Sequence, residues 1–369
     1  MSDIHMRGDG FFSSRSRPSS RWDNKRQRKT ALAFGVLVPL AILSLLLATT
    51  MGASNASALK LLAAWWSGGL DSLDMRDRIV ILDIRLPRVL MGFLVGASLA
   101  VSGAVMQGLF RNPLADPGLT GVSAGASLGA VGIIVLGQGL AAPVVAILGP
   151  FALPIAAFCG GLATTALLYR IATAGGQTSV GVLLLAGIAL GTLSGALTGF
   201  MIFLADDKQL RDLTFWGMGS LAGSDWTKLM AALPVMIPGL LAAPFLASGL
   251  NALALGEASA FHLGIPVERL KRVAIASVAA ATGASVALSG GIGFIGIIAP
   301  HLLRLTIGPD HRALLPASAL LGGTLLIGAD AFARTVVAPA ELPIGILTAT
   351  VGGPFFLWIL LRNRARLAL

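Results

Sequence analysis

The feature that most constrains this chain is a succession of long segments that contain no Asp, Glu, Lys or Arg. Nine such segments fall between residues 31 and 361. A transmembrane α-helix needs about 20 mostly apolar residues to cross the hydrocarbon of a bilayer. The pattern therefore predicts an all-α, polytopic membrane protein. The segments are Ala31–Met51, Val89–Phe110, Gly118–Gly137, Pro143–Tyr169, Ser179–Ala205, Leu229–Leu250, Val273–Leu303, Ala313–Ala329 and Leu342–Leu361.

The seventh segment is best divided into two helices. It is 31 residues long and contains the cluster Ser289-Gly290-Gly291-Ile292-Gly293, which would break a helix. Division there gives ten spans, and an even number places both basic ends of the chain on one side. That side then holds 18 of the 27 Lys and Arg residues, and the other side holds 9. Because positively charged loops stay in the cytoplasm, we expect about ten helices in a bacterial inner membrane, with both termini cytoplasmic.

The two ends of the chain are basic, and the middle is not. Residues 1–29 are polar and Ser/Arg-rich, and we expect a disordered cytoplasmic segment there, followed by a ten-helix domain over residues 30–369. The first apolar run has 21 residues, longer than the roughly 7–15 of a cleaved signal peptide. This favours an uncleaved anchor, although the tract at residues 53–58 resembles a cleavage site. The net charge is +10, and the basic clusters at the two ends of the chain flank apolar runs, so we expect no nucleic-acid partner.

Composition agrees with a surface that is hidden in lipid. Only 12% of the residues are charged, against about 25% in soluble domains. Cys159 is the single cysteine, so neither a disulfide framework nor a thiolate metal cluster can form, and we expect no metal site.

The spans hold few ionisable side chains that could couple transport to an ion. Secondary transporters usually place such groups inside the membrane, whereas here His301 lies near the end of a short span and Asp330 closes another. The chain also lacks a G-x-x-x-x-G-K-[ST] phosphate loop. If the protein pumps, a partner chain must bind ATP and Mg, and this chain itself carries no cofactor. An ion-coupled transporter and a purely structural membrane subunit are the alternatives.

One motif is shared with serine hydrolases. Gly121-Val122-Ser123-Ala124-Gly125 matches G-x-S-x-G, and His301 is a candidate partner. The motif exposes its serine on a strained strand–turn–helix, but here it falls in a helix-like run of small residues. We therefore expect no catalytic residue, and an intramembrane serine protease is a distant alternative.

Three groups of residues are candidates for function. The loop Asn251–Arg272 is predicted to hold two short helices, Glu257–Leu263 and Pro266–Arg272, that could dock a soluble motor or form an ordinary connector. A stripe of small residues in the fifth span predicts either close helix packing or a smooth translocation path; similar stripes mark the second and third spans. Arginines beside membrane ends on the outer side either reach lipid headgroups or bind carboxylates of a partner. The stripe is Gly187, Gly191, Gly195 and Gly199, and the arginines are Arg85, Arg88 and Arg334.

Longer motifs carry a family resemblance. Arg85-Leu-Pro-Arg88, the run from Val95 to Gly118 that includes Arg111-Asn-Pro-Leu-Ala-Asp-Pro, and Leu255-Gly-Glu257 occur in order. They are followed by Gly293-Phe-Ile-Gly296, Pro300-His-Leu-Leu-Arg304 and Glu341-Leu-Pro-Ile-Gly345. Over roughly residues 60–362 the sequence resembles the permeases of type II ABC importers for cobalamin, ferric siderophores and heme.

The resemblance implies partners and roles. The family's permease is a homodimer that binds two cytoplasmic ABC ATPases and one periplasmic substrate-binding protein. Arg85, Arg88 and Arg334 would dock the binding protein, and the glycine-striped fifth span would line the path. The coupling residues would be Glu257, Ala258, Leu263, Gly264 and Pro266, and the gate would be Thr178 and Ser179. The segments Phe110–Pro117, Asp207–Arg211 and Phe215–Leu221 look most like those of heme importers, with a ferric siderophore or cobalamin as the alternative ligand.

Overall fold

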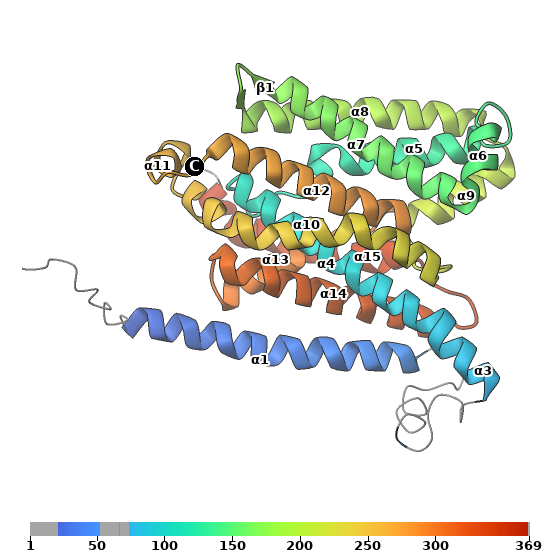
Figure 1. Ribbon diagram of the computed structural model, residues 1–369, viewed down its shortest axis with the longest axis horizontal. Coiled ribbons are helices and arrows are strands. Elements are labelled where there is room, and N and C mark those ends of the chain that lie inside the picture. Colours follow the sequence, from blue (N-terminus) through green and yellow to red (C-terminus); the bar gives the residue numbers. More distant parts are fainter. Residues whose placement is uncertain (1–20, 52–65, 67–73, 368–369) are drawn as a thin grey trace, which may run out of the picture.

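The computed structural model describes residues 21–51, 66 and 74–367, which form a bundle of roughly parallel helices (Figure 1). The strands of this part are the two-residue β1 (Thr173–Ala174) and β2 (Gln177–Thr178). The helices are α1 (Arg21–Thr50), α3 (Met75–Arg78), η2 (Ile79–Arg85), α4 (Leu86–Leu109), η3 (Pro117–Thr120), α5 (Val122–Leu136), α6 (Ala142–Leu148), η4 (Gly149–Phe151), α7 (Ala152–Ala172), α8 (Val180–Leu204), α9 (Asp207–Gly217), α10 (Trp226–Leu253), α11 (Glu257–His262), α12 (Val267–Ser289), α13 (Ile295–Thr306), α14 (His311–Val336) and α15 (Ile344–Leu367).

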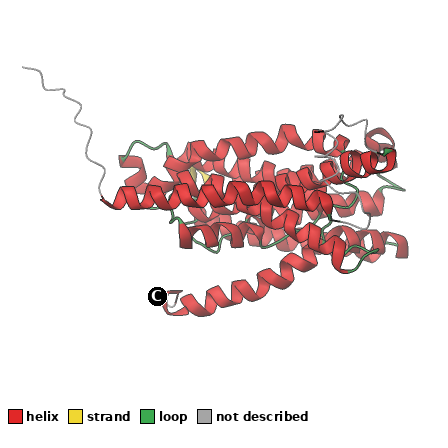
Figure 2. Cartoon of the chain, turned by 90° about the horizontal axis from the view of Figure 1, so that it is seen from below, coloured by secondary structure: helices red, strands yellow, loops and turns green. Residues whose placement is uncertain are grey.

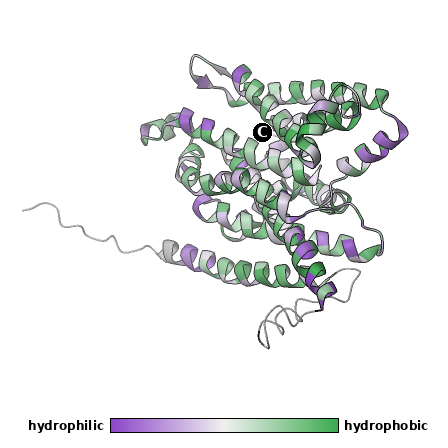
Figure 3. Ribbon diagram, turned by 45° about the vertical axis from the view of Figure 1, so that its right-hand side comes forward, coloured by the Kyte–Doolittle hydropathy of each residue, from purple (hydrophilic) through white to green (hydrophobic). Residues whose placement is uncertain are grey.

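The ten expected spans are present. Seven helical segments in the described part are long and apolar enough to cross a membrane, and three shorter apolar helices, α5, α13 and the start of α15, make up the rest. Figure 3 shows apolar residues along the helices and hydrophilic residues gathered toward the ends of the bundle. The start of α1 and the end of α15 lie at the same end (Figures 1 and 2). The predicted all-α, polytopic fold is confirmed.

Several helix boundaries differ from those expected. The second span begins at Met75 rather than Val89, because the charged residues before the apolar run continue the helix through the π-helical turn η2. The fourth span is interrupted by the positive φ of Gly149 (53°) and by Pro150. The seventh segment breaks where predicted, at Gly290 (φ 68°).

The first helix is also longer than expected. α1 begins at Arg21, so residues 21–29, predicted to be disordered, are helical. Their polar turns extend the same helix beyond its apolar run, which an α-helix can do where water solvates its side chains. Residues 1–20 lie outside the described part.

Helix α4 occupies the centre of the bundle and is buried over most of its length. Its small residues let neighbouring backbones approach, since a Cβ at Gly96 would collide with the Gly322 carbonyl of α14. A Cβ at Gly103 would collide with the Gly296 carbonyl of α13. Small-residue contacts of this kind hold membrane helices together because lipid gives no hydrophobic drive. The packing explanation therefore accounts for the stripe of the second span.

Candidate functional site

The residues predicted for docking, coupling and gating lie at the two ends of the bundle. The arginine end is the end that holds η2, the start of α4 and the end of α14, with Arg85, Arg88 and Arg334. The α11 end holds α11, the hairpin β1–β2 and the start of α1 (Figure 1).

At the arginine end, Arg88 lies between two carboxylates. Its Nε and Nη2 donate to the carboxylate of Asp330 at 2.8–3.2 Å, and its Nη1 and Nη2 each donate to Glu341 at 2.9 Å. This double fork matches the planar donor geometry of a guanidinium. Asp330 is 1% exposed and also pairs with Arg334 at 3.0 Å, so one buried carboxylate joins α4 to α14.

The other guanidinium donors cap the first helix. Arg334 donates to the carbonyls of Ala48 and Met51, and Arg85 donates to those of Thr49 and Thr50. The last four carbonyls of a helix have no partner within it, and positive charge is favourable there. The arginines predicted to dock a partner are therefore buried, and each already binds groups of its own chain. The spacing of Asp330 and Arg334, four residues apart on one helix face, was the sequence signal for part of this cluster.

Glu341 is the exposed member of the cluster. The hydrogen bond from Arg88, opposed by burial and assisted by the charges of Arg88 and Arg334, holds the pKa of Glu341 below its usual 4.5. Because the pKa of Glu341 is lower in the folded protein than in the unfolded chain, its ionisation stabilises the fold at pH values above the unfolded-state pKa. This stabilisation is lost as the pH falls through the folded-state pKa.

We expect Glu341→Gln to lower the Tm at pH 7. Once the pH falls well below 4.5, we expect the Tm of the variant to equal that of the wild type. The Glu341 side chain is 41% exposed, so screening limits the effect at pH 7 to roughly 1 kcal/mol. Thermal melts of both purified proteins between pH 3 and about 8 measure it, and a constant Tm difference across that range would contradict it.

At the α11 end, the predicted coupling segment, Asn251–Arg272, consists of the end of α10, the short helix α11 and the start of α12. Gly256 (φ 108°) precedes α11 and Gly264 (φ 80°) follows it, which confirms the first predicted short helix. The second predicted piece is not separate: Pro266 caps α12, and Pro266–Arg272 leads directly into that long helix. Asn251 belongs to α10. The apolar side chains of Leu255, Phe261 and Leu263 are exposed around α11.

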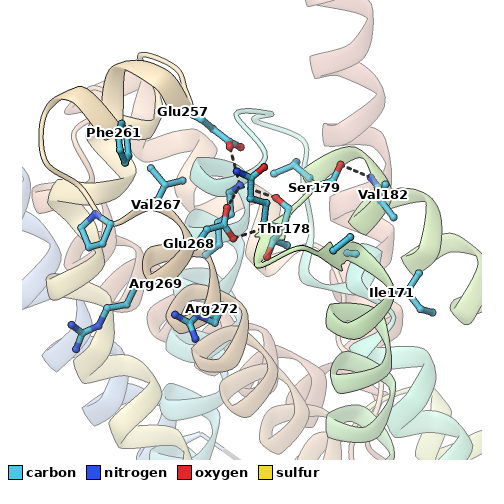
Figure 4. A pocket seen from close by; sticks show the side chains of 16 residues that line it. Ile171, Thr178, Ser179, Val182, Glu257, Phe261, Val267, Glu268, Arg269 and Arg272 are labelled. Atoms are coloured by element: carbon cyan, nitrogen blue, oxygen red, sulfur yellow. Dashed lines mark hydrogen bonds and ion pairs between the residues drawn. The ribbon is translucent and has the colours of Figure 1, made fainter.

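The gate candidates lie beside this segment. Gly175 (φ 59°) and Gly176 (φ 79°) form the two-residue turn of the hairpin, a geometry that requires glycine-like backbone at both positions. Thr178 pairs with Thr173 across the strands, and Ser179 caps α8 by accepting from Val182 N. A cavity of about 920 Å³ is lined by the hairpin, α11 and the start of α12 (Figure 4).

The glycine stripe of α8 differs from the other two stripes. A Cβ at Gly191, Gly195 or Gly199 would meet no atom within 4 Å, whereas Gly187 is buried. In contrast, Gly125 and Gly129 of α5 pack tightly on α7. α8 lies on the edge of the bundle opposite α1 (Figure 1), so most of its stripe faces outward.

The hydrolase motif lacks its required context. Ser123 lies in the first turn of α5 and follows the 3₁₀ helix η3 rather than a strand. His301 packs edge-on against Phe355. Among the described residues, no three His, Cys, Asp or Glu side chains come together as a metal site would need.

Comparison with known proteins identifies the class. The fold is that of the membrane-spanning permease of an ABC importer. A solved structure described as an inward-facing conformation of a metal-chelate type ABC transporter superposes with a TM-score of 0.76 at 33% identity, covering 88% of this chain and 97% of the other.

The family is also established. Residues 40–362 match the FecCD transport family, and the chain belongs to it. The hemin transport system permease HmuU of Yersinia pestis is 44% identical over 88% of this chain and 95% of its own length. The cobalamin import permease BtuC of Halobacterium salinarum is 46% identical over 78% of this chain and 74% of its own length. These relatives are permease subunits of import systems and not enzymes themselves.

Proposed function

We propose that this permease carries heme across the bacterial inner membrane. The observation that carries the proposal is its 44% identity to a hemin permease over nearly the full length of both chains. The cobalamin permease has a similar sequence identity, 46%, but the match covers a smaller share of each chain, 78% of this one and 74% of its own. Cobalamin and ferric siderophores are the alternative substrates.

Reconstitution with the partner ATPase and binding protein tests the substrate. Uptake of hemin into proteoliposomes should exceed that of cobalamin and of a ferric hydroxamate siderophore by at least tenfold at equal concentrations. Faster uptake of cobalamin would assign the chain to the alternative, and equal uptake of all three would remove the argument for heme.

The α11 end is proposed to face the cytoplasm and the arginine end the periplasm. The basic residues at the start of α1 and in the last turns of α15 belong to the α11 end, which fits the excess of positive charge on the cytoplasmic side. Both termini are then cytoplasmic. The exposed apolar residues around α11 suit the docking of an ATPase, and the homodimer would bind two ATPase subunits. The ATPase subunits would bind ATP and Mg. The docking residues on this chain would be Glu257, Ala258, Leu263, Gly264 and Pro266.

The arginine end is proposed to receive a periplasmic binding protein. Arg88 already holds a half-exposed carboxylate in a bidentate fork, which is the chemistry that a partner's glutamate would reproduce. A partner carboxylate would replace Glu341 on Arg88, while Arg85 and Arg334 keep the end of α1 in place.

The outward stripe of α8 is proposed to line the path at the axis of a homodimer. Small side chains there leave a smooth wall, and Thr178 and Ser179 lie at its cytoplasmic mouth as the gate. The support is the open space beside Gly191, Gly195 and Gly199.

We expect Gly195→Trp to lower transport at least tenfold without lowering the Tm, because the indole enters the path and its Cβ meets no atom of its own subunit within 4 Å. The matched control is Gly132→Trp on α5, where a Cβ likewise meets no atom within 4 Å. Uptake and thermal melts are measured for both variants. Equal transport by the two variants would refute the path assignment.

A further inference from the structure

A buried lysine joins the coupling segment to the gate. Lys271 is 2% exposed, although it is the second of three basic residues, Arg269, Lys271 and Arg272, whose sequence pattern is typical of a charged surface loop. Its Nζ donates to Glu257 Oε2 at 2.9 Å, to Glu268 Oε1 at 3.0 Å and to the Thr178 carbonyl at 2.7 Å. An ammonium has three N–H donors, so each donor has one acceptor.

The three acceptors come from three separate elements. Glu257 opens α11, Glu268 lies in the first turn of α12, and Thr178 ends the hairpin. Glu268 Oε2 also accepts from Thr178 N at 2.9 Å, which fixes both backbone groups of Thr178. Figure 4 shows Glu257, Glu268 and Thr178 directed toward one another, with Arg269 and Arg272 pointing away from them.

The contacts of Lys271 also form the polar connection between α11 and the hairpin β1–β2. Within the described residues, the hydrogen bonds that link α11 to the hairpin pass through the Lys271 ammonium. A buried charge that loses a partner is strongly disfavoured, so a displacement of Glu257 must be followed by Lys271 or by separation of the pair. Lys271 and Glu268 both lie at the start of α12 and both hold Thr178, so a movement of α11 that displaces the start of α12 through Lys271 also displaces the hairpin.

We propose that Lys271 is a positioning residue that transmits motion of the coupling helix α11 to the gate at Thr178 and Ser179. The proposal rests on the coupling and gate roles given above. Movement imposed on α11 by an ATPase pulls on Glu257, the ammonium passes the displacement to Thr178, and the first residues of α8 move with the hairpin.

The first test compares hydrolysis with transport. In the reconstituted complex, Lys271→Met should leave assembly with the ATPase intact and ATP turnover within about threefold, while hemin uptake per ATP falls at least tenfold. Glu257→Gln, which keeps a hydrogen-bond acceptor but removes the charge, should show a smaller fall. The matched control is Lys208→Met at an exposed position of α9, which should leave the ratio unchanged. An unchanged uptake-to-ATP ratio in Lys271→Met would overturn the proposal.

The second test does not depend on transport. Spin labels at Ser259→Cys on α11 and Gln177→Cys on the hairpin, both exposed, are placed in a Cys159→Ser background. The distance distribution between them should be at least twice as wide with Lys271→Met as with Lys271 present. Equal widths of the distance distribution in the two proteins would overturn the proposed role of Lys271, whatever the transported substrate is. A wild-type complex that imports none of the three chelates, with the expected widening still seen, would instead refute the proposed function alone.

Discussion

Replacement of Asp330 by alanine is expected to destabilise the protein by about 3–5 kcal/mol, which is the usual cost of leaving buried charge without its partner. Asp330 is 1% exposed and neutralises both Arg88 and Arg334. Without it, two buried guanidiniums share Glu341 as the nearby carboxylate of the cluster. The end of α1 also loses its fixed caps, because Arg334 is no longer held in place.

Thermal melts in detergent measure this effect as a fall in Tm on the order of 5–10 °C. Asp212→Ala is the matched control, since Asp212 is an exposed aspartate of α9, and it should leave the Tm within about 1 °C. The double variant Arg88→Met, Asp330→Ala should lose less stability than the two single variants lose in sum, because it removes both members of one ion pair. A normal Tm for Asp330→Ala would show that the cluster does not hold the arginine end together.

Replacement of Gly103 by valine is the second large effect expected. A Cβ at this position would lie far closer to the Gly296 carbonyl oxygen than van der Waals contact allows, and neither backbone can move aside without separating α4 from α13. We expect a loss of about 3 kcal/mol or more, at the upper end of overpacking effects.

Gly103→Ala should show most of the same loss, because the first added carbon makes the collision. Gly132→Val on α5 is the control, as nothing lies within 4 Å of its Cβ position. Size-exclusion profiles after graded heating report the folded fraction of each variant. Similar profiles for Gly103→Val and Gly132→Val would mean that the contact between α4 and α13 is looser than described.

The sequence was sufficient to predict the helices but not the pairing between them. Charge-free runs mark the spans because lipid excludes charge, and the glycines after Ser289 mark the break between α12 and α13. The exact starts were missed at Met75 and Arg21, because polar turns outside the membrane carry no hydropathy signal even where they continue a helix.

The glycine stripes show why a periodic pattern alone does not assign a role. Small residues every four positions occur in α4, α5 and α8, yet the first two stripes pack on neighbouring helices and most of the third faces outward. Which helix lies opposite a stripe depends on contacts between residues far apart in the chain, and a one-dimensional period does not contain that information.

The charged residues were the hardest to interpret from the sequence. Arg85 and Arg334 cap the carbonyls of α1, which requires the end of α1 to lie beside α14. Lys271 was counted among the positive charges of a cytoplasmic loop, but it is buried because α11 folds back over the start of α12. In each case the residue type was informative, while its partner became identifiable only in three dimensions.

We propose that a separate ATPase drives this permease, whose own sequence contains no phosphate loop. The most direct measurement is hemin uptake into proteoliposomes that contain the permease, its binding protein and the ATPase, supplied with ATP or with a non-hydrolysable analogue. We expect accumulation with ATP and none with the analogue or without the ATPase. Accumulation that persists without the ATPase, driven by an ion gradient, would contradict it.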